Sequence, residues 1–317
     1  MTADVVVIGA GMAGLACARQ LAAAGRAPLV LDKGRAPGGR MATRRADCAA
    51  GPLRFDHGAQ YLTARDPGFA QLIEGLAGRA VARWPDGSGR ARWVGLPGMS
   101  GLPRALAEGL ELRQGTEVTG LHPDGAGWQV ETTRDTIAAR AVVLTVPAPQ
   151  AAALIGADHP LAAALGTVRL EPCLTLMAAF PAAAPRPFTD QVSETHPLAW
   201  IAQDSTKPGR PDGAVSWVAQ ARPDWSARHL GEDREEIAAR MLPLLAERLG
   251  TEPGAAIYAA AHRWRYARVT SPLGADFLQD APGGLYLGGD WCLGARVEAA
   301  WRSGDSIARA ILETSDA

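Results

Sequence analysis

The chain has 317 residues, too many for one ordinary core, so we expect one large domain or two of moderate size. Hydrophobic residues make up 47% and charged residues 21%, a composition that excludes a largely disordered chain, and the longest apolar runs are far shorter than the roughly 20 residues of a membrane span. The 32 lysines and arginines balance 33 aspartates and glutamates, so neither nucleic acid nor an anionic membrane is an expected partner.

The N-terminus and the cysteines indicate a cytoplasmic protein. The opening residues, MTADVVVIGAG, lack a positive region and a cleavage site before the apolar stretch, which favours a first strand over a signal peptide. The cysteines show no CxxC pair and no metal-ligand spacing, so we expect reduced thiols and no metal site. They stand at Cys17, Cys48, Cys173 and Cys292.

The first elements predict one βαβ unit. Residues 4–8, DVVVI, form an apolar, β-branched run typical of a strand covered on both faces in a parallel sheet. The residues after GAG, from Met12 to Ala24, have the pattern of an alanine-rich helix that stops at Gly25. PLVLD then forms a second strand that ends in Asp32.

The spacing of the glycines in this unit predicts dinucleotide binding. Gly9 allows a tight turn, Gly11 lets the backbone approach a pyrophosphate, and Gly14 lets helix and strand pack closely. Asp32, 18 residues after Gly14, stands where an acidic side chain accepts hydrogen bonds from the adenosine ribose. The alternative is a glycine turn that binds no ligand.

The next segment, RAPGGRMATRR at 35–45, favours FAD over NAD. Gly38 and Gly39 provide a second flexible turn, and Arg40 can reach the pyrophosphate that the first turn holds. By itself this arginine cluster would be a solvated loop, so the inference depends on its position beyond the second strand.

The middle of the chain contains further strands and a second lobe. GTEVTGL, around Val118, and AVVLTVPAPQ, at 141–150, resemble strands beside the dinucleotide, although ordinary sheet strands explain them nearly as well. The second ends in Thr145, Val146 and Pro147. Beyond it, CLTLMAAF and AVSWVAQA predict strands and residues 233–249 predict a helix. The Pro- and Ala-rich segment FPAAAPRPF is expected to be a surface loop.

The chain closes with a second glycine-rich strand, turn and helix. GLYLGGD, at 284–290, predicts a buried strand and a tight turn with Asp290 at its tip. Residues 297–312 have a helical pattern, and Glu298 in the first turn is either a ligand contact or a helix N-terminal acid.

Motifs along most of the chain resemble those of a known family. GAGMAGL followed by Asp32, then GGRM and GGDW, is similar to the flavin amine oxidase superfamily, which includes monoamine oxidase and phytoene desaturase. Four segments look like those of the bacterial renalases within it. They are FDHGAQY at 55–61, RWVGLPGMSGL at 92–102, AHRWRYAR at 261–268 and GGDWCLGARVEAAW at 288–301.

The resemblance implies an α/β fold with two lobes. The first is a Rossmann-type, doubly wound parallel sheet of the glutathione reductase kind, which binds FAD. The second is a discontinuous, mixed-sheet α+β lobe for the substrate. The expected FAD-binding domain comprises residues 1–69, 98–149 and 276–317, and the substrate domain comprises residues 70–97 and 150–275.

The resemblance also implies where FAD binds. Asp290 would lie near the ribityl chain and pyrophosphate, and the helix after residue 297 would aim its positive end at the pyrimidine edge of the flavin. Cys292 follows a tryptophan and is not in a CxxG-like context, so FAD is expected to be non-covalent. The candidate cofactor residues are Gly9, Gly11, Met12, Ala13, Gly14, Asp32, Lys33, Gly39, Arg40, Met41, Gly58, Ala59, Gln60, Tyr61, Val118, Pro147, Gly289, Asp290, Arg296, Val297 and Glu298.

No catalytic residue is certain, and the candidates for the flavin face are aromatic or histidine side chains. Tyr61 and Trp264 lie in motifs that the resemblance ties to the flavin, while His57 is a proton donor or simply structural. Other tryptophans and tyrosines could line the pocket, and about half of the set is expected to be core. These are Trp93, Trp200, Trp217, Tyr266 and Trp291. Arginines near Trp264 would hold substrate phosphates or lie free on the surface. They are Arg263, Arg265 and Arg268.

The resemblance implies an oxidase that acts on a dinucleotide. Renalases oxidise misreduced 2- or 6-dihydro isomers of NAD(P), passing a hydride to flavin N5 and reducing O2 to H2O2. The ring nitrogen lone pair drives hydride loss, so such a substrate needs no general base. The alternatives are a small amine or carotenoid-type oxidoreductase, and a protein that binds FAD without turnover.

Overall fold

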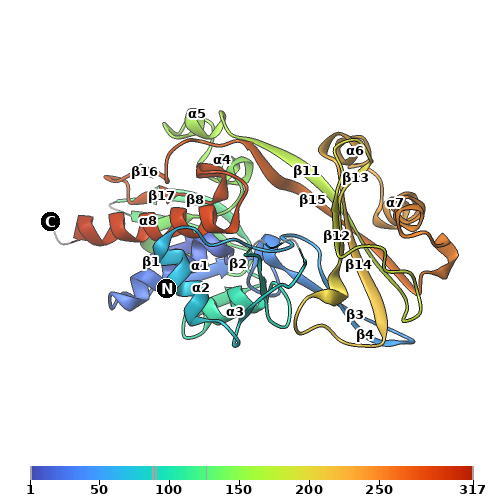
Figure 1. Cartoon of the computed structure of the whole chain (residues 1–317). Helices are drawn as coiled ribbons and strands as arrows, with labels where there is room; N and C mark the ends of the chain where they lie inside the picture. Colours follow the sequence, from blue (N-terminus) through green and yellow to red (C-terminus); the bar gives the residue numbers. More distant parts are fainter. Residues whose placement is uncertain (1, 88, 90, 126, 316–317) are drawn as a thin grey trace.

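The computed structural model describes residues 2–87, 89, 91–125 and 127–315, and these residues form two large sheets that lie side by side, with two hairpins (Figure 1). Strands from residues 2–32, 111–144 and 278–287 build the first sheet, and strands from residues 169–271 build the second. Two long strands of the second sheet, β11 (Arg169–Pro181) and β15 (Tyr258–Ser271), reach back toward the first lobe (Figure 1). No helix in the described ranges is both long enough and apolar enough to cross a membrane.

In the described chain, eight strands form the first sheet, whose centre is parallel. The main path runs β16–β17–β10–β1–β2–β7, with β9 attached to β10 and β8 attached to β9. β1 pairs in parallel with β10 and β2, while β16, β9 and β8 are antiparallel. The strands are β1 (Thr2–Ile8), β2 (Leu29–Asp32), β7 (Glu111–Gln114), β8 (Val118–Asp124), β9 (Gly127–Thr132), β10 (Thr136–Leu144), β16 (Leu278–Asp280) and β17 (Leu285–Leu287). The parallel strands therefore present their carboxyl ends at one edge, where ligands bind in such sheets.

Helices cover both faces of this sheet. Successive side chains of β1 alternate between two cores, because a strand has a period of two. Val5 and Val7 pack with side chains of α1 and α8, whereas Val6 and Ile8 pack with those of α4. The helices of this lobe are α1 (Met12–Ala23), α2 (Pro67–Gly75), α3 (Gly101–Ala107), α4 (Ala148–Ile155), α5 (Ala162–Leu165) and α8 (Val297–Ser315).

The second sheet has the order β12–β13–β14–β11–β15, and its neighbouring strands are antiparallel wherever the chain is described. The expected second lobe is thus present, but its sheet is antiparallel and not mixed, because successive strands mostly return beside one another. Its other strands are β12 (Asp190–Val192), β13 (Leu198–Gln203) and β14 (Ala214–Ala221). Two helices accompany it, α6 (Pro223–Arg228) and α7 (Arg234–Leu249). A capping box from Asp233 begins α7, and Gly250 ends it at φ 67°.

Two hairpins connect the lobes. The first joins β3 (Thr43–Cys48) to β4 (Gly51–Asp56), and its Phe55 packs against Met177 of the second sheet. The second joins β5 (Val81–Arg83) to β6 (Trp93–Gly95), and its apolar side chains join the core around α1. Short 3-10 helices complete the described chain. They are η1 (Gly39–Met41), η2 (Asp204–Thr206), η3 (Pro253–Ala255) and η4 (Asp290–Cys292).

The first and last helices pack backbone against backbone. α1 contacts α8 directly, and a Cβ at Gly304 of α8 would lie only 2.0 Å from the carbonyl oxygen of Ala13. A backbone atom cannot move aside as a flexible side chain can. Glycine at this position therefore fixes the end of the chain against its beginning.

We predict that Gly304→Ala lowers the free energy of unfolding by about 1–3 kcal/mol, because the added methyl group must push the two helices apart. Urea unfolding of the purified protein measures this loss. Gly75→Ala is the matched control, since a Cβ there would meet nothing within 4 Å. It should be neutral or stabilising by about 0.5–1 kcal/mol, and equal losses for the two variants would contradict the close contact.

Candidate active site

A large cavity of about 1890 Å³ lies between the carboxyl ends of the parallel strands and the second sheet. The turns after β1, β2 and β17 line one side, and residues of β13, β14 and β15 line the other. Of the cofactor residues predicted from the sequence, all but Gly14 and Glu298 line this cavity. The tertiary structure therefore brings glycine-rich segments from both ends of the chain to one site.

The turn between β1 and α1 fits a pyrophosphate. Gly9 has φ 110°, and a Cβ at Gly14 would lie 1.9 Å from the carbonyl oxygen of Gly9. A Cβ at Gly11 would meet no atom within 4 Å, because this position faces the cavity. No side chain of the described residues caps α1, so its first N–H groups and its positive end are available to an anion.

Asp32 is held rigidly at the end of β2. Its carboxylate accepts hydrogen bonds from the N–H groups of Ala10 and Gly34, both at 2.6 Å. Each oxygen keeps a free lone pair for a further donor. The side chain lines the cavity, so it can accept hydrogen bonds from a ribose as the sequence predicts.

Arg40 and Asp290 form a bidentate ion pair in the wall of the cavity. The guanidinium donates to both carboxylate oxygens, at 2.7 and 2.6 Å, and also to the carbonyl oxygen of Ala267 in β15 at 3.1 Å. The Asp290 side chain is 8% exposed, so the pair is partly desolvated. This contact joins the loop after β2, the turn after β17 and the second sheet at one point.

Glu298 acts on a neighbouring loop. Its carboxylate accepts hydrogen bonds from the N–H groups of Arg65 and Asp66, at 2.5 and 2.6 Å. Asp66 in turn caps α2 by accepting from Gly68 and Phe69. Because the Glu298 carboxylate is engaged by these two N–H groups and Glu298 does not line the cavity, the structure favours a positioning role over direct ligand contact.

The aromatic candidates divide into two groups. Tyr61, Trp200, Trp264 and Tyr266 line the cavity, whereas Trp93, Trp217 and Trp291 are buried in the cores and do not. We call Tyr61, Trp200 and Trp264 the aromatic wall. Tyr61 and Trp200 have ring centroids 5.8 Å apart.

A histidine pair supports the Trp264 side of this wall. The Trp264 indole donates to the carbonyl oxygen of His57 at 2.7 Å, and the two rings stack at 5.3 Å. His57 itself is buried behind Trp264 and outside the cavity lining. His262 is not among the site residues predicted from the sequence, although it lines the cavity and its ring centroid is 4.2 Å from that of Trp264. Residues two apart in a strand lie on the same face of the sheet. The position of His262 two residues before Trp264 was therefore the signal that could have found it.

Both histidines are biased toward the neutral form. Burial lowers the pKa of His57. Burial, followed by repulsion from His57 and nearby arginines, lowers the pKa of His262 to about 4. At neutral pH the cavity therefore has an uncharged imidazole beside Trp264, which can donate or accept a hydrogen bond but adds no charge.

The arginines near Trp264 point to the cavity rim and the surface. Arg263 donates to the carbonyl oxygens of Leu230 and Glu232, at 3.4 and 2.8 Å. Arg265 and Arg268 are exposed and line the cavity, and neither side chain has a hydrogen bond or ion pair to the described residues. Their positive charges are therefore free for an anionic ligand.

A buried group of four charges lies beneath the segment 55–61. Lys207 approaches Asp204 at 2.6 Å and Asp56 at 3.3 Å, and Arg210 contacts the same two carboxylates. Burial opposes ionisation of Asp204, but Arg210 and Lys207 outweigh it and hold the pKa of this carboxyl below its usual range. Lys207 also donates to the side-chain oxygen of Gln60 at 3.2 Å, which orients a cavity-lining amide. No sequence motif indicated this group.

The four cysteines are free thiols. Burial raises the pKa of Cys173 to about 11 and that of Cys292 to about 12, and also raises the pKa of Cys17. Cys292 does not line the cavity. A thiol with so high a pKa is a poor nucleophile.

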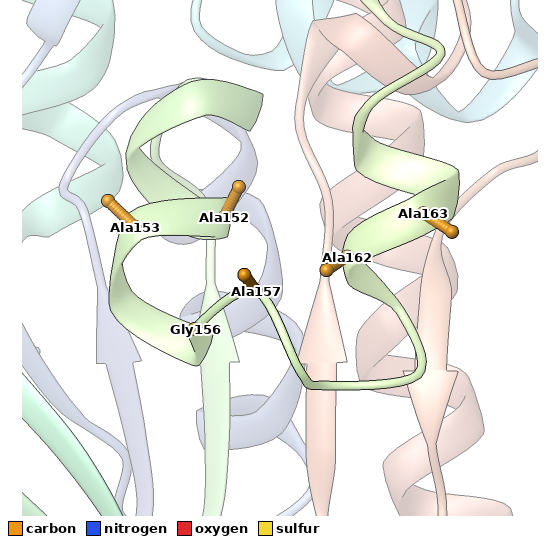
Figure 2. A pocket seen from close by; sticks show the side chains of 6 residues that line it. All are labelled: Ala152, Ala153, Gly156, Ala157, Ala162 and Ala163. Carbon is orange, nitrogen blue, oxygen red and sulfur yellow. The ribbon is translucent and has the colours of Figure 1, made fainter.

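A second hollow, about 560 Å³ in volume, lies between α4 and α5 (Figure 2). Its lining consists of alanine and glycine only. The residues are Ala152, Ala153, Gly156, Ala157, Ala162 and Ala163. With no polar side chain in its lining, this hollow has no group for catalysis or for ligand orientation.

Family comparisons agree with the two-lobed site. The family described as Flavin containing amine oxidoreductase matches residues 82–312, and the NAD(P)-binding Rossmann-like domain matches residues 7–76. The first match covers most of the chain, and the second covers the glycine turn after β1. Both matches include segments that line the cavity.

Solved structures show the same fold. The "Putative protoporphyrinogen oxidase" of Exiguobacterium sp. 255-15 has a TM-score of 0.78 and 16% identity, with 98% of this chain and 99% of that one covered. Putrescine oxidase bound to putrescine has a TM-score of 0.65 and 15% identity, with 99% of each chain covered. Cyclohexylamine oxidase from Brevibacterium oxydans IH-35A has a TM-score of 0.68 and 14% identity, covering 99% and 100%. At such identities the likeness concerns the fold and not the substrate.

We predict that Arg40→Met destabilises the protein by about 2–4 kcal/mol, because it leaves the buried carboxylate of Asp290 without its partner. The variant should also lose flavin during gel filtration, measured as the ratio of absorbance near 450 nm to that at 280 nm.

Arg79→Met is the matched control, since its ion pair with Glu108 is about two-thirds exposed on both sides and should contribute little. Arg40→Met paired with Asp290→Asn should cost less than the two single changes together. Additive losses would show that the two side chains act independently.

The low pKa of His262 predicts a pH-dependent contribution to stability. The unfolded imidazole binds a proton near pH 6.5 and the folded one only near pH 4. The contribution of His262 to the free energy of unfolding is therefore fully present above pH 6.5 and is lost as the pH drops toward 4. Replacing His262 by Gln should remove on the order of 1 kcal/mol of this loss, after allowance for partial exposure.

Unfolding by urea at pH 7.5 and pH 4.5 measures the effect as the difference between wild type and His262→Gln at each pH. His122→Gln is the control, because that side chain is exposed on β8. A difference for His262→Gln that stays constant with pH would refute the neutral assignment.

Proposed function

The chain belongs to the flavin containing amine oxidoreductase family, and on this premise we propose a renalase-like FAD-dependent oxidase. Its substrates would be the misreduced 2- or 6-dihydro isomers of NAD(P), which it would return to NAD(P)+. The motifs at 55–61 and 261–268 support this assignment, because they supply Tyr61 and Trp264 to one cavity.

FAD would bind non-covalently along the first sheet. The N–H groups at the start of α1 and the glycine turn would hold the pyrophosphate, Asp32 the ribose, and Arg40 with Asp290 the middle of the cofactor. When bound, FAD supplies a two-electron acceptor that O2 can reoxidise with release of H2O2. Residues 1–69, 98–149 and 276–317 would form this cofactor domain, and residues 70–97 and 150–275 the substrate domain.

The size of the cavity is the observation that carries the proposal. Pockets for single drug-sized ligands hold about 300–1,000 Å³. This cavity, at about 1890 Å³, leaves room for a large second ligand beside FAD. The free arginines Arg265 and Arg268 on its lining would attract the phosphates of a dinucleotide.

The chemistry of the aromatic wall also suits a dihydropyridine. Tyr61 and Trp264 offer ring faces for a planar substrate, and the neutral His262 beside them is no strong base. The ring nitrogen of a dihydropyridine supplies the driving force for hydride loss. These side chains would therefore bind and orient the ring and exclude water from it, without removing a proton.

Anaerobic mixing tests the proposal. The FAD-loaded protein is mixed with the 6-dihydro isomer of NAD(P), with ordinary NADPH or with an arylalkylamine, while absorbance near 450 nm is followed. Bleaching within seconds by the isomer alone, recovered on admitting air, is expected. Trp264→Phe should slow this bleaching about tenfold by loosening the ring position, whereas Trp225→Phe, outside the cavity lining, should not.

The other outcomes are equally informative. Bleaching by the amine alone would assign the chain to amine oxidation and overturn the proposal. No bleaching by any of the three would leave flavin binding without turnover of these substrates.

A further inference from the structure

An arginine of the 92–102 motif has no role in the cofactor site, although it lies directly behind the aromatic wall. The guanidinium carbon of Arg92 is 4.6 Å from the ring centroid of Tyr61, 5.4 Å from that of Trp200 and 5.7 Å from that of Trp84. Tyr61 and Trp200 line the cavity, but Arg92 and Trp84 do not. The Arg92 side chain is only 6% exposed, so it belongs to the wall and not to the surface.

Two carboxylates complete the surroundings of Arg92. Asp86 contacts its guanidinium at 2.6 Å and Asp190 at 3.0 Å, and both side chains are buried or nearly so. Three aromatic rings with two carboxylates make a typical site for an organic cation. We call this arrangement the cation box. The chain fills it with its own arginine.

A filled cation box affects ligand choice in the cavity. An ammonium group that approached Tyr61 and Trp200 from the cavity would meet rings and carboxylates already engaged by Arg92. The two carboxylates outweigh the single charge of Arg92, so the box excludes a second cation because its rings and carboxylates are occupied and not because of repulsion. A neutral planar ring does not need the occupied site.

Trp200 supplies a second, independent observation. Its indole N–H is buried and has no hydrogen-bond partner among the described residues. A buried donor without a partner is costly, so a turn of the indole that let a ligand acceptor reach this N–H would gain affinity. A carboxamide oxygen can accept this bond, whereas an ammonium group has no lone pair to offer.

We infer that Arg92 is a specificity-determining residue that excludes organic ammonium ligands from the aromatic wall and leaves the wall to neutral rings bearing a carboxamide. This inference rests on the proposed function, since it explains why a chain of the amine oxidoreductase family would accept a nicotinamide-type ring. Arg92 acts through Tyr61 and Trp200 and does not itself touch the ligand.

The test compares two probes of similar shape, benzamide and benzylammonium, on the FAD-loaded protein. Dissociation constants are read from the perturbation of the flavin absorption band. The wild type should bind benzamide at least tenfold more tightly than benzylammonium. Arg92→Gln should raise the affinity for benzylammonium at least tenfold and change that for benzamide less than threefold.

Control variants separate charge from folding. Arg92→Lys keeps a cation in the box and should still reject benzylammonium. Arg83→Gln removes an exposed arginine that lies 4.0 Å above Trp93, outside the box, and should change neither affinity. Trp200→Phe should weaken benzamide several-fold and leave benzylammonium unchanged.

Two results would overturn the inference. One is a wild type that binds benzylammonium as tightly as benzamide, which can be measured even if Arg92→Gln does not fold. The other is an unchanged ratio of the two affinities in Arg92→Gln. Oxidation of the dihydro isomers is assayed separately on the wild type, so failure of the proposed function and failure of this inference remain distinguishable.

Discussion

The ion pair between Arg40 and Asp290 holds the candidate site together. These residues are 250 positions apart in the chain, yet two short hydrogen bonds join their side chains. Arg40 also binds the backbone of Ala267 in β15, so the same guanidinium reaches the second sheet. Because the pair is partly desolvated, each charge depends on the other, and the turns on either side are fixed in position.

A second set of buried charges fixes the opposite wall. Asp56 and Asp204 come from different lobes and share Lys207 and Arg210. Such a group is costly to desolvate, so its value lies in geometry more than in stability. It holds the segment 55–61 between the two sheets, which places Tyr61 on the cavity and orients Gln60.

The placement of charged and neutral side chains around the aromatic wall relates the fold to the chemistry of the site. Charged side chains lie behind the wall, where Arg92 meets Tyr61 and Trp200, while His262 beside Trp264 is held neutral by burial. This arrangement suits the binding of a neutral ring better than it suits proton transfer. The fold is shared with solved oxidases that are 14–15% identical, so the fold alone does not fix the substrate.

The sequence by itself determined the fold class, the βαβ unit and the glycine-rich segments of the cavity lining. These features follow from local patterns: a continuous apolar, β-branched run in β1, glycines at Gly9, Gly11 and Gly14, and a second glycine turn before Asp290. Only the tertiary structure decided that Arg40 pairs with Asp290, that Glu298 binds the loop at Arg65, and that Arg92 enters the cation box. These contacts join residues far apart in the chain, and the charge of a side chain does not reveal which distant partner it will meet.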